Sequence, residues 1–168
     1  MHRLMVLYLV DGYLSYDCPC HIMAETIIVR ECRHGQVRVQ FGNIIRVDGD
    51  IMVIPANNRL AGREGLDERM QLAAGDELRA RCTEIAVERR KEGKQPCGVG
   101  EAVSTSGYNL PAENLVHVVA PDCRRPNQDN FRRELLVNSY NAMFHEISKI
   151  KPRKTVVTPP LGMDVFAY

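Results

Sequence analysis

The sequence has no long hydrophobic run and no excess of charge of either sign. Its longest apolar run, residues 4–10, is far shorter than a bilayer span and is followed at once by Asp11 and Gly12, so we expect no membrane-spanning helix and a cytoplasmic protein. The 22 basic and 21 acidic residues leave a formal net charge of +1, which gives no electrostatic reason to expect a nucleic-acid partner.

The chain also lacks the cysteine patterns of a metal site or a disulfide scaffold. Its six cysteines are scattered, and a secreted domain of this kind would need a denser arrangement. The run from Cys18 to His21 gathers soft ligands, but its spacing is too tight for a zinc knuckle and no second pair follows. We therefore expect reduced thiols, no metal and no cofactor.

The 168 residues are enough for one hydrophobic core, so we expect one domain and a monomer. Residues 1–22 contain Tyr, Cys and Pro without periodicity beyond Val10, whereas residues 23–29 read like a natural chain start. We predict an N-terminal appendage of residues 1–22 and a folded domain of residues 23–168. If the native protein starts at Met23, the appendage results from a translation start assigned too far upstream.

Strand and helix patterns alternate along that domain. Two β-branched runs, residues 25–30 and 36–41, predict a hairpin, and the apolar run of residues 50–55 predicts a strand covered on both faces. Gly75 divides a helical stretch into two. The order indicates an α/β fold, a three-layer α/β/α sandwich with a mixed, mostly parallel sheet. The remaining predicted elements are strands at 101–105, 114–120 and 155–158, and a helix marked by Phe131, Leu135, Met143 and Ile147, which ends at Lys151-Pro152.

Three blocks carry specific motifs. Residues 53–67 read Val-Ile-Pro-Ala-Asn-Asn-Arg-Leu-Ala-Gly-Arg-Glu-Gly-Leu-Asp, residues 107–112 read Gly-Tyr-Asn-Leu-Pro-Ala, and residues 158–168 read Thr-Pro-Pro-Leu-Gly-Met-Asp-Val-Phe-Ala-Tyr. In this order they resemble the signatures of the macro domain family, over roughly residues 40–168. The resemblance implies a domain without its usual last helix that binds ADP-ribose or an ADP-ribosylated protein.

The resemblance also implies a ligand site at the carboxyl ends of the strands. Asn43 and Ile44 would meet the adenine, Asn57 the distal ribose, and glycine-rich loops the diphosphate. Asn57 and Asp67 are the candidate catalytic residues for hydrolysis of mono-ADP-ribosyl or O-acetyl-ADP-ribose esters. The ligand-binding set is Asn43, Ile44, Asn57, Asn58, Gly62, Gly65, Leu66, Gly162, Val165 and Phe166.

Several positions depart from the family pattern. Asp164 puts a carboxylate where the family has a glycine against the diphosphate, and Gln71 replaces a histidine of the hydrolase subgroup and cannot act as a base. The alternative is therefore a degenerate macro domain that serves as a non-enzymatic interaction module. Taken alone, Asp67 reads as a helix N-terminal carboxylate and Asn57 as a turn residue. The other departures are Asn43, Ile54, Arg63 and Glu64.

Overall fold

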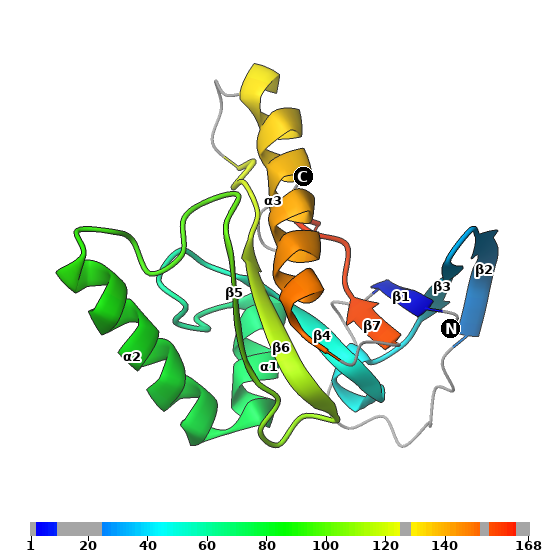
Figure 1. Ribbon diagram of the computed structural model, residues 1–168, viewed down its shortest axis with the longest axis horizontal. Helices are drawn as coiled ribbons and strands as arrows, with labels where there is room; N and C mark the ends of the chain where they lie inside the picture. The colour runs from blue at the N-terminus through cyan, green and yellow to red at the C-terminus, as the bar shows by residue number, and fades with distance from the viewer. Residues whose placement is uncertain (1–2, 10–24, 125–128, 152–154, 164–168) are drawn as a thin grey trace.

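A computed structural model of the chain describes residues 3–9, 25–124, 129–151 and 155–163. Its strands form one seven-stranded sheet in the order β2-β3-β1-β7-β4-β6-β5 (Figure 1). Within these ranges, three α-helices and one 3₁₀ helix connect the strands. The elements are β1 (Arg3–Leu9), β2 (Glu25–Cys32), β3 (Gly35–Phe41), η1 (Ile44–Arg46), β4 (Gly49–Ala56), α1 (Gly65–Ala74), α2 (Asp76–Lys91), β5 (Ala102–Ser106), β6 (Ala112–Val119), α3 (Asp129–Lys149) and β7 (Thr155–Thr158).

The sheet is mixed and mostly parallel. β1 runs parallel to β3 and β7, and β4 runs parallel to β6 and β7. Only the two outer pairs of the described sheet, β2 with β3 and β5 with β6, are antiparallel. The predicted fold class is confirmed, and so is the hairpin, since β2 and β3 are joined by the predicted turn.

The N-terminal strand differs from the sequence-based expectation. Residues 1–22 were expected to form an appendage, yet Arg3–Leu9 pairs on one side with β3 and on the other with β7. This strand therefore occupies an interior position of the sheet, between β3 and β7. Residues 10–22 lie outside the described residues, and a native start at Met23 stays a prediction.

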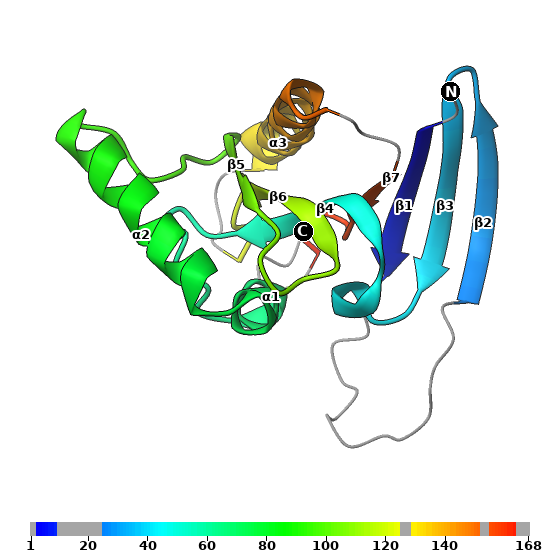
Figure 2. The same ribbon diagram turned by 60° about the horizontal axis from the view of Figure 1, so that its bottom comes forward.

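Alternation along β4 divides the core between the two faces of the sheet. Met52 and Ile54 pack on one face with the apolar residues of α1 and α2, while Ile51 and Val53 pack on the other with Met143 of α3. Figure 2 shows the resulting layers, with α3 on one side of β4, β6 and β5 and with α1 and α2 on the opposite side.

The helices begin and end close to the predicted positions. Gly75 separates α1 from α2 with a φ of 93°, a backbone angle that favours glycine. Although α3 has 21 residues, neither it nor another helix of the described ranges is apolar enough to cross a bilayer. α1 and α2 pack against one face of the sheet and α3 against the other.

His117 of β6 is a core residue, as its apolar strand predicts. Its side chain is fully buried, and Nε2 lies 3.0 Å from the hydroxyl of Thr105, while Nδ1 has no partner among the described residues. Burial lowers the pKa of His117 from 6.5 to about 4, because the charged imidazole would lose its hydration. The folded protein therefore holds this histidine neutral.

We expect this histidine to make the protein less stable in mild acid. Between its unfolded pKa of 6.5 and its folded pKa of about 4, the unfolded chain binds the proton, so stability is present above that window and is lost as the pH falls through it. From about pH 7 to about pH 5, the loss is about 2 kcal/mol. Urea unfolding of the wild type and His117→Leu at both pH values measures it, because other titrating groups cancel in the difference. If the difference in free energy of unfolding between the two proteins is the same at both pH values, the lowered pKa of His117 is wrong.

Candidate functional site

The loops that carry the predicted site lie at one edge of the sheet. Because β3, β4, β6 and β7 belong to the parallel part, their carboxyl ends meet at that edge. The loops that follow them begin at Gly42, Asn57, Ala120 and Pro159. In open α/β sheets, ligands bind at this edge, where the loops and helix N-termini face outward.

The loop after β4 is organised by Asn57. The Oδ1 atom of its side chain accepts hydrogen bonds from the backbone N–H groups of Arg59, at 2.9 Å, and Ala61, at 3.3 Å. Its backbone carbonyl accepts from the N–H of Leu60 at 3.0 Å, which closes a turn. Leu60 has a φ of 55°, which is rare for a branched side chain and is tolerated where surrounding contacts enforce it. The asparagine thus has the role of a turn residue.

Asp67 lies in the first turn of α1 and is 5% exposed. Its Oδ2 accepts a hydrogen bond from Nδ2 of Asn57 at 3.0 Å and a longer one from the Asn57 backbone N–H at 3.4 Å. Its Oδ1 accepts from Nε2 of Gln71 at 3.1 Å. The structure therefore brings the two candidate catalytic residues, Asn57 and Asp67, into direct contact and adds Gln71 to them.

Burial raises the pKa of the Asp67 carboxyl from 3.8 to about 6. Hydrogen bonds from Gln71, from the backbone of Asn57 and Gly62, and from the Asn57 side chain lower it, but they offset only part of the desolvation. A carboxyl group with this pKa is largely ionised at neutral pH and still basic enough to take up a proton.

The glycines of this loop adopt backbone angles that favour glycine. Gly62 has a φ of 52° and Gly65 a φ of 66°, and Gly65 is the first residue of α1. Glu64 precedes the helix without a side-chain cap, so the first N–H groups of α1 are not capped by that side chain. The N-terminal end of a helix favours anions such as phosphate.

Neighbouring loops are tied to this one and to α3. Arg124, after β6, lies 3.8 Å from Glu64 and makes a two-pronged contact with Asp122. The pair with Glu64 is solvent-exposed, so it adds little stability, but it brings a positive charge beside the one negative charge of the glycine-containing loop. On the other side, the hydroxyl of Tyr140 accepts the backbone N–H of Leu161 and holds the loop after β7.

The remaining predicted ligand-binding residues differ in exposure, and some of them lie outside the described residues. Asn43 is exposed, and its Oδ1 caps η1 by accepting the N–H of Ile45 at 3.1 Å. The Ile44 side chain is fully buried in the core, so that residue offers a ligand its backbone alone. Asn58 is exposed, Leu66 is buried, and Gly162 is buried with a φ of 81°. Asp164, Val165 and Phe166 lie outside the described residues.

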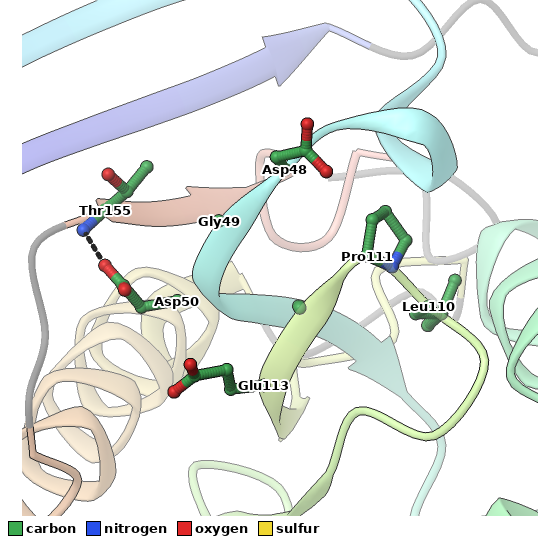
Figure 3. A pocket seen from close by; sticks show the side chains of 8 residues that line it. Asp48, Gly49, Asp50, Leu110, Pro111, Glu113 and Thr155 are labelled. Atoms are coloured by element: carbon green, nitrogen blue, oxygen red, sulfur yellow. Dashed lines mark hydrogen bonds between the residues drawn. The ribbon is translucent and has the colours of Figure 1, made fainter.

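A hollow of about 560 Å³ lies at the opposite edge of the sheet, where β4, β6 and β7 begin (Figure 3). Its lining includes the carboxylates of Asp48, Asp50 and Glu113, and Asp50 accepts the backbone N–H of Thr155. Three carboxylates disfavour an anionic ligand such as a diphosphate. The hollow is therefore separate from the Asn57 and Asp67 pair and chemically unlike a phosphate site.

Sequence reasoning missed three contributors to the site. Gln71 was judged only as a residue that cannot be a base, although its spacing of four residues from Asp67 on one helix predicts contact. Arg124 contacts Glu64, and Tyr140 contacts Leu161. Both partners are distant in sequence, so no local pattern predicts these contacts.

Comparisons with known proteins agree on the family. A family model described as Macro domain matches residues 53–168. A macro domain-containing protein of Mesorhizobium japonicum is 32% identical over 133 residues, covering 79% of this chain and 69% of the relative. An O-acetyl-ADP-ribose deacetylase of Escherichia fergusonii is 30% identical over 135 residues, covering 79% of this chain and 71% of the relative. The solved Oceanobacillus iheyensis macrodomain with ADP has a TM-score of 0.76 and 26% identity, covering 87% of this chain and 74% of that one.

Proposed function

Because this chain belongs to the macro domain family, we propose that it binds ADP-ribose at the carboxyl edge of its sheet and hydrolyses mono-ADP-ribosyl or O-acetyl-ADP-ribose esters. The observation that carries the proposal is the contact between Asn57 and the buried Asp67 beside a glycine-containing loop. Relatives described as O-acetyl-ADP-ribose deacetylases support the reaction class.

Binding of the diphosphate is supported by the backbone around α1. Gly62 and Gly65 carry no side chain that would keep backbone N–H groups away from phosphate oxygens, and the N-terminus of α1 adds a favourable dipole. Arg124 lies beside Glu64 and reduces the repulsion that Glu64 would exert. The solved macrodomain with ADP supports a ligand of this class.

The proposed hydrolysis uses Asp67 to take a proton from water. The attacking water oxygen forms a bond to the ester carbonyl carbon, its proton goes to the Asp67 carboxylate, and the ester bond to the ribose oxygen breaks with return of that proton. The 3.4 Å hydrogen bond from the Asn57 backbone N–H is longer than the bonds that Asp67 accepts from the Asn57 and Gln71 side chains, and in this proposal the attacking water takes its place. Asn57 keeps a second Nδ2 hydrogen for a ribose hydroxyl.

A second candidate function is binding without turnover, as an interaction module. It is favoured by the number of donors around Asp67: three hydrogen bonds, with a further contribution from Gly62, occupy the four acceptor positions of the carboxylate. It is also favoured by Gln71, which cannot act as a base.

Calorimetric titration with ADP-ribose, with AMP as the adenine-only control, tests the proposal first. We expect a Kd in the micromolar range, about −8 kcal/mol, and weaker binding of AMP because it lacks the second phosphate and the distal ribose. Release of acetate from O-acetyl-ADP-ribose then separates the two candidates, since an interaction module binds and releases none. A folded protein that gives no heat with ADP-ribose would reject both ligand-binding functions and would favour a degenerate macro domain that acts as an interaction module without this ligand.

A further inference from the structure

Gln71 is a buried glutamine whose side chain has two acceptors as partners. It is 1% exposed, and its Nε2 donates to Oδ1 of Asp67 at 3.1 Å and to the backbone carbonyl of Leu60 at 3.3 Å. Both partners are oxygen atoms that only accept, so the carboxamide must present its NH₂ group to them. Its two N–H bonds thus join α1 to the loop after β4.

The loop fits closely around this carboxamide. A Cβ atom at Gly62 would come within 2.6 Å of Cδ of Gln71 and within 2.7 Å of its Oε1. Leu60, whose carbonyl Gln71 binds, holds the rare φ of 55°. A contact that holds a residue in the left-handed region offsets part of the conformational cost of that backbone angle. Gln71 therefore packs against the loop as well as against Asp67.

We propose that Gln71 is a positioning residue for the ester hydrolysis proposed above, a permanently neutral donor that fixes the loop at Leu60 and orients the Asp67 carboxylate. The inference rests on that proposed function for its catalytic meaning, while the contacts that carry it exist without ligand. Because Asn57 and Gln71 both carry neutral amides, Asp67 is the ionisable member of the trio that these three residues form.

The titratable and charged groups around Asp67 are either neutral in the working pH range or exposed to solvent, so we expect Asp67 to titrate with a single midpoint. On α2, burial raises the pKa of the Cys82 thiol to about 11, with a smaller contribution from Asp67, so this thiol stays neutral across the working range. On the loop, Arg63 and Glu64 are exposed, and on α1 Glu68 is exposed. On β4, the stretch Ile51–Ala56 that faces the two helical layers carries no charged side chain.

The titration of Asp67 in the ligand-free protein tests the inference. The side-chain carboxyl carbon is followed by NMR in protein labelled at aspartate, with Asp67→Asn used to assign the signal. We expect Gln71→Met, which keeps the length but removes the donor, to raise the midpoint by about one pH unit, because a hydrogen bond to the charged form is lost. We expect Gln71→Glu to raise it further, because a second carboxylate disfavours ionisation. Gln95→Met, at an exposed glutamine outside the site, should leave it unchanged.

The pH at which the rate of ester hydrolysis at saturating substrate is half-maximal should rise in the same order, from the wild type to Gln71→Met and then to Gln71→Glu. A purely structural role would lower the unfolding temperature of Gln71→Met and leave the Asp67 midpoint at its wild-type value, and that outcome would overturn the inference. An unraised midpoint in Gln71→Glu would overturn it as well. If no variant and no wild-type sample hydrolyses the ester, the proposed function fails, and the NMR midpoints still decide whether Gln71 positions Asp67.

Discussion

Asp67→Asn is expected to lower the rate of ester hydrolysis at saturating substrate by about 100-fold or more, because the variant removes the only group in the trio able to take up a proton. Asparagine keeps the size of the side chain, so the loss is chemical rather than a cavity effect. Affinity for ADP-ribose should fall much less than the rate, since the glycine loop and the N-terminus of α1 are unchanged. The measurement is acetate release under saturation, with calorimetry of ADP-ribose in parallel.

The pH dependence sharpens this expectation. Because burial raises the pKa of Asp67 to about 6, the wild-type rate should rise through about pH 6 and level off above it, and Asp67→Asn should lack that rise. Glu68→Gln is the matched control, since Glu68 is an exposed carboxylate in the same first turn of α1. If Asp67→Asn keeps the wild-type rate and pH profile, Asp67 is not the base, and binding without turnover becomes the favoured function.

Local patterns predicted most of the fold because each element has its signal within a short window. The break between α1 and α2 follows from Gly75, and the last strand, Thr155–Thr158, has the predicted bounds. The position of β1 could not be predicted in this way. Its place between β3 and β7 depends on pairing with residues about 30 and 150 positions away, which no local periodicity encodes.

The candidate site was predictable by residue type but not by contact. The asparagine and aspartate were identified from motif positions, and the structure adds that they are hydrogen-bonded to each other. Glu64 was identified as a departure from the family pattern, and the structure adds that Arg124 of a different loop lies beside it. Contacts of this kind arise because parallel strands deliver distant loops to one edge, so they follow from topology rather than from spacing.

The Gly107-Tyr-Asn-Leu-Pro-Ala block carried much of the family resemblance, yet its role is structural. Gly107 lies in the turn from β5 to β6, where its N–H donates to the carbonyl of Glu113 at 2.9 Å. A Cβ atom there would lie 1.5 Å from the backbone oxygen of Ala112, a distance that no rotamer change relieves because the Cβ position is fixed by the backbone and the oxygen belongs to the main chain. This turn stands at the amino end of β6, at the opposite edge from Asn57 and Asp67.

Gly107→Ala is therefore expected to lower the free energy of unfolding by about 3 kcal/mol or more, since the turn must open to admit one methyl group. The matched control is Gly93→Ala: that glycine has a φ of 73° but nothing within 4 Å of its Cβ position, so the cost there is conformational only, about 1 kcal/mol. Urea unfolding of both variants measures the difference, and equal losses would show that the crowding at Ala112 is not felt. Where Gly107→Ala remains folded, ADP-ribose should bind as it does to the wild type, because the altered turn and the proposed site stand at opposite edges of the sheet.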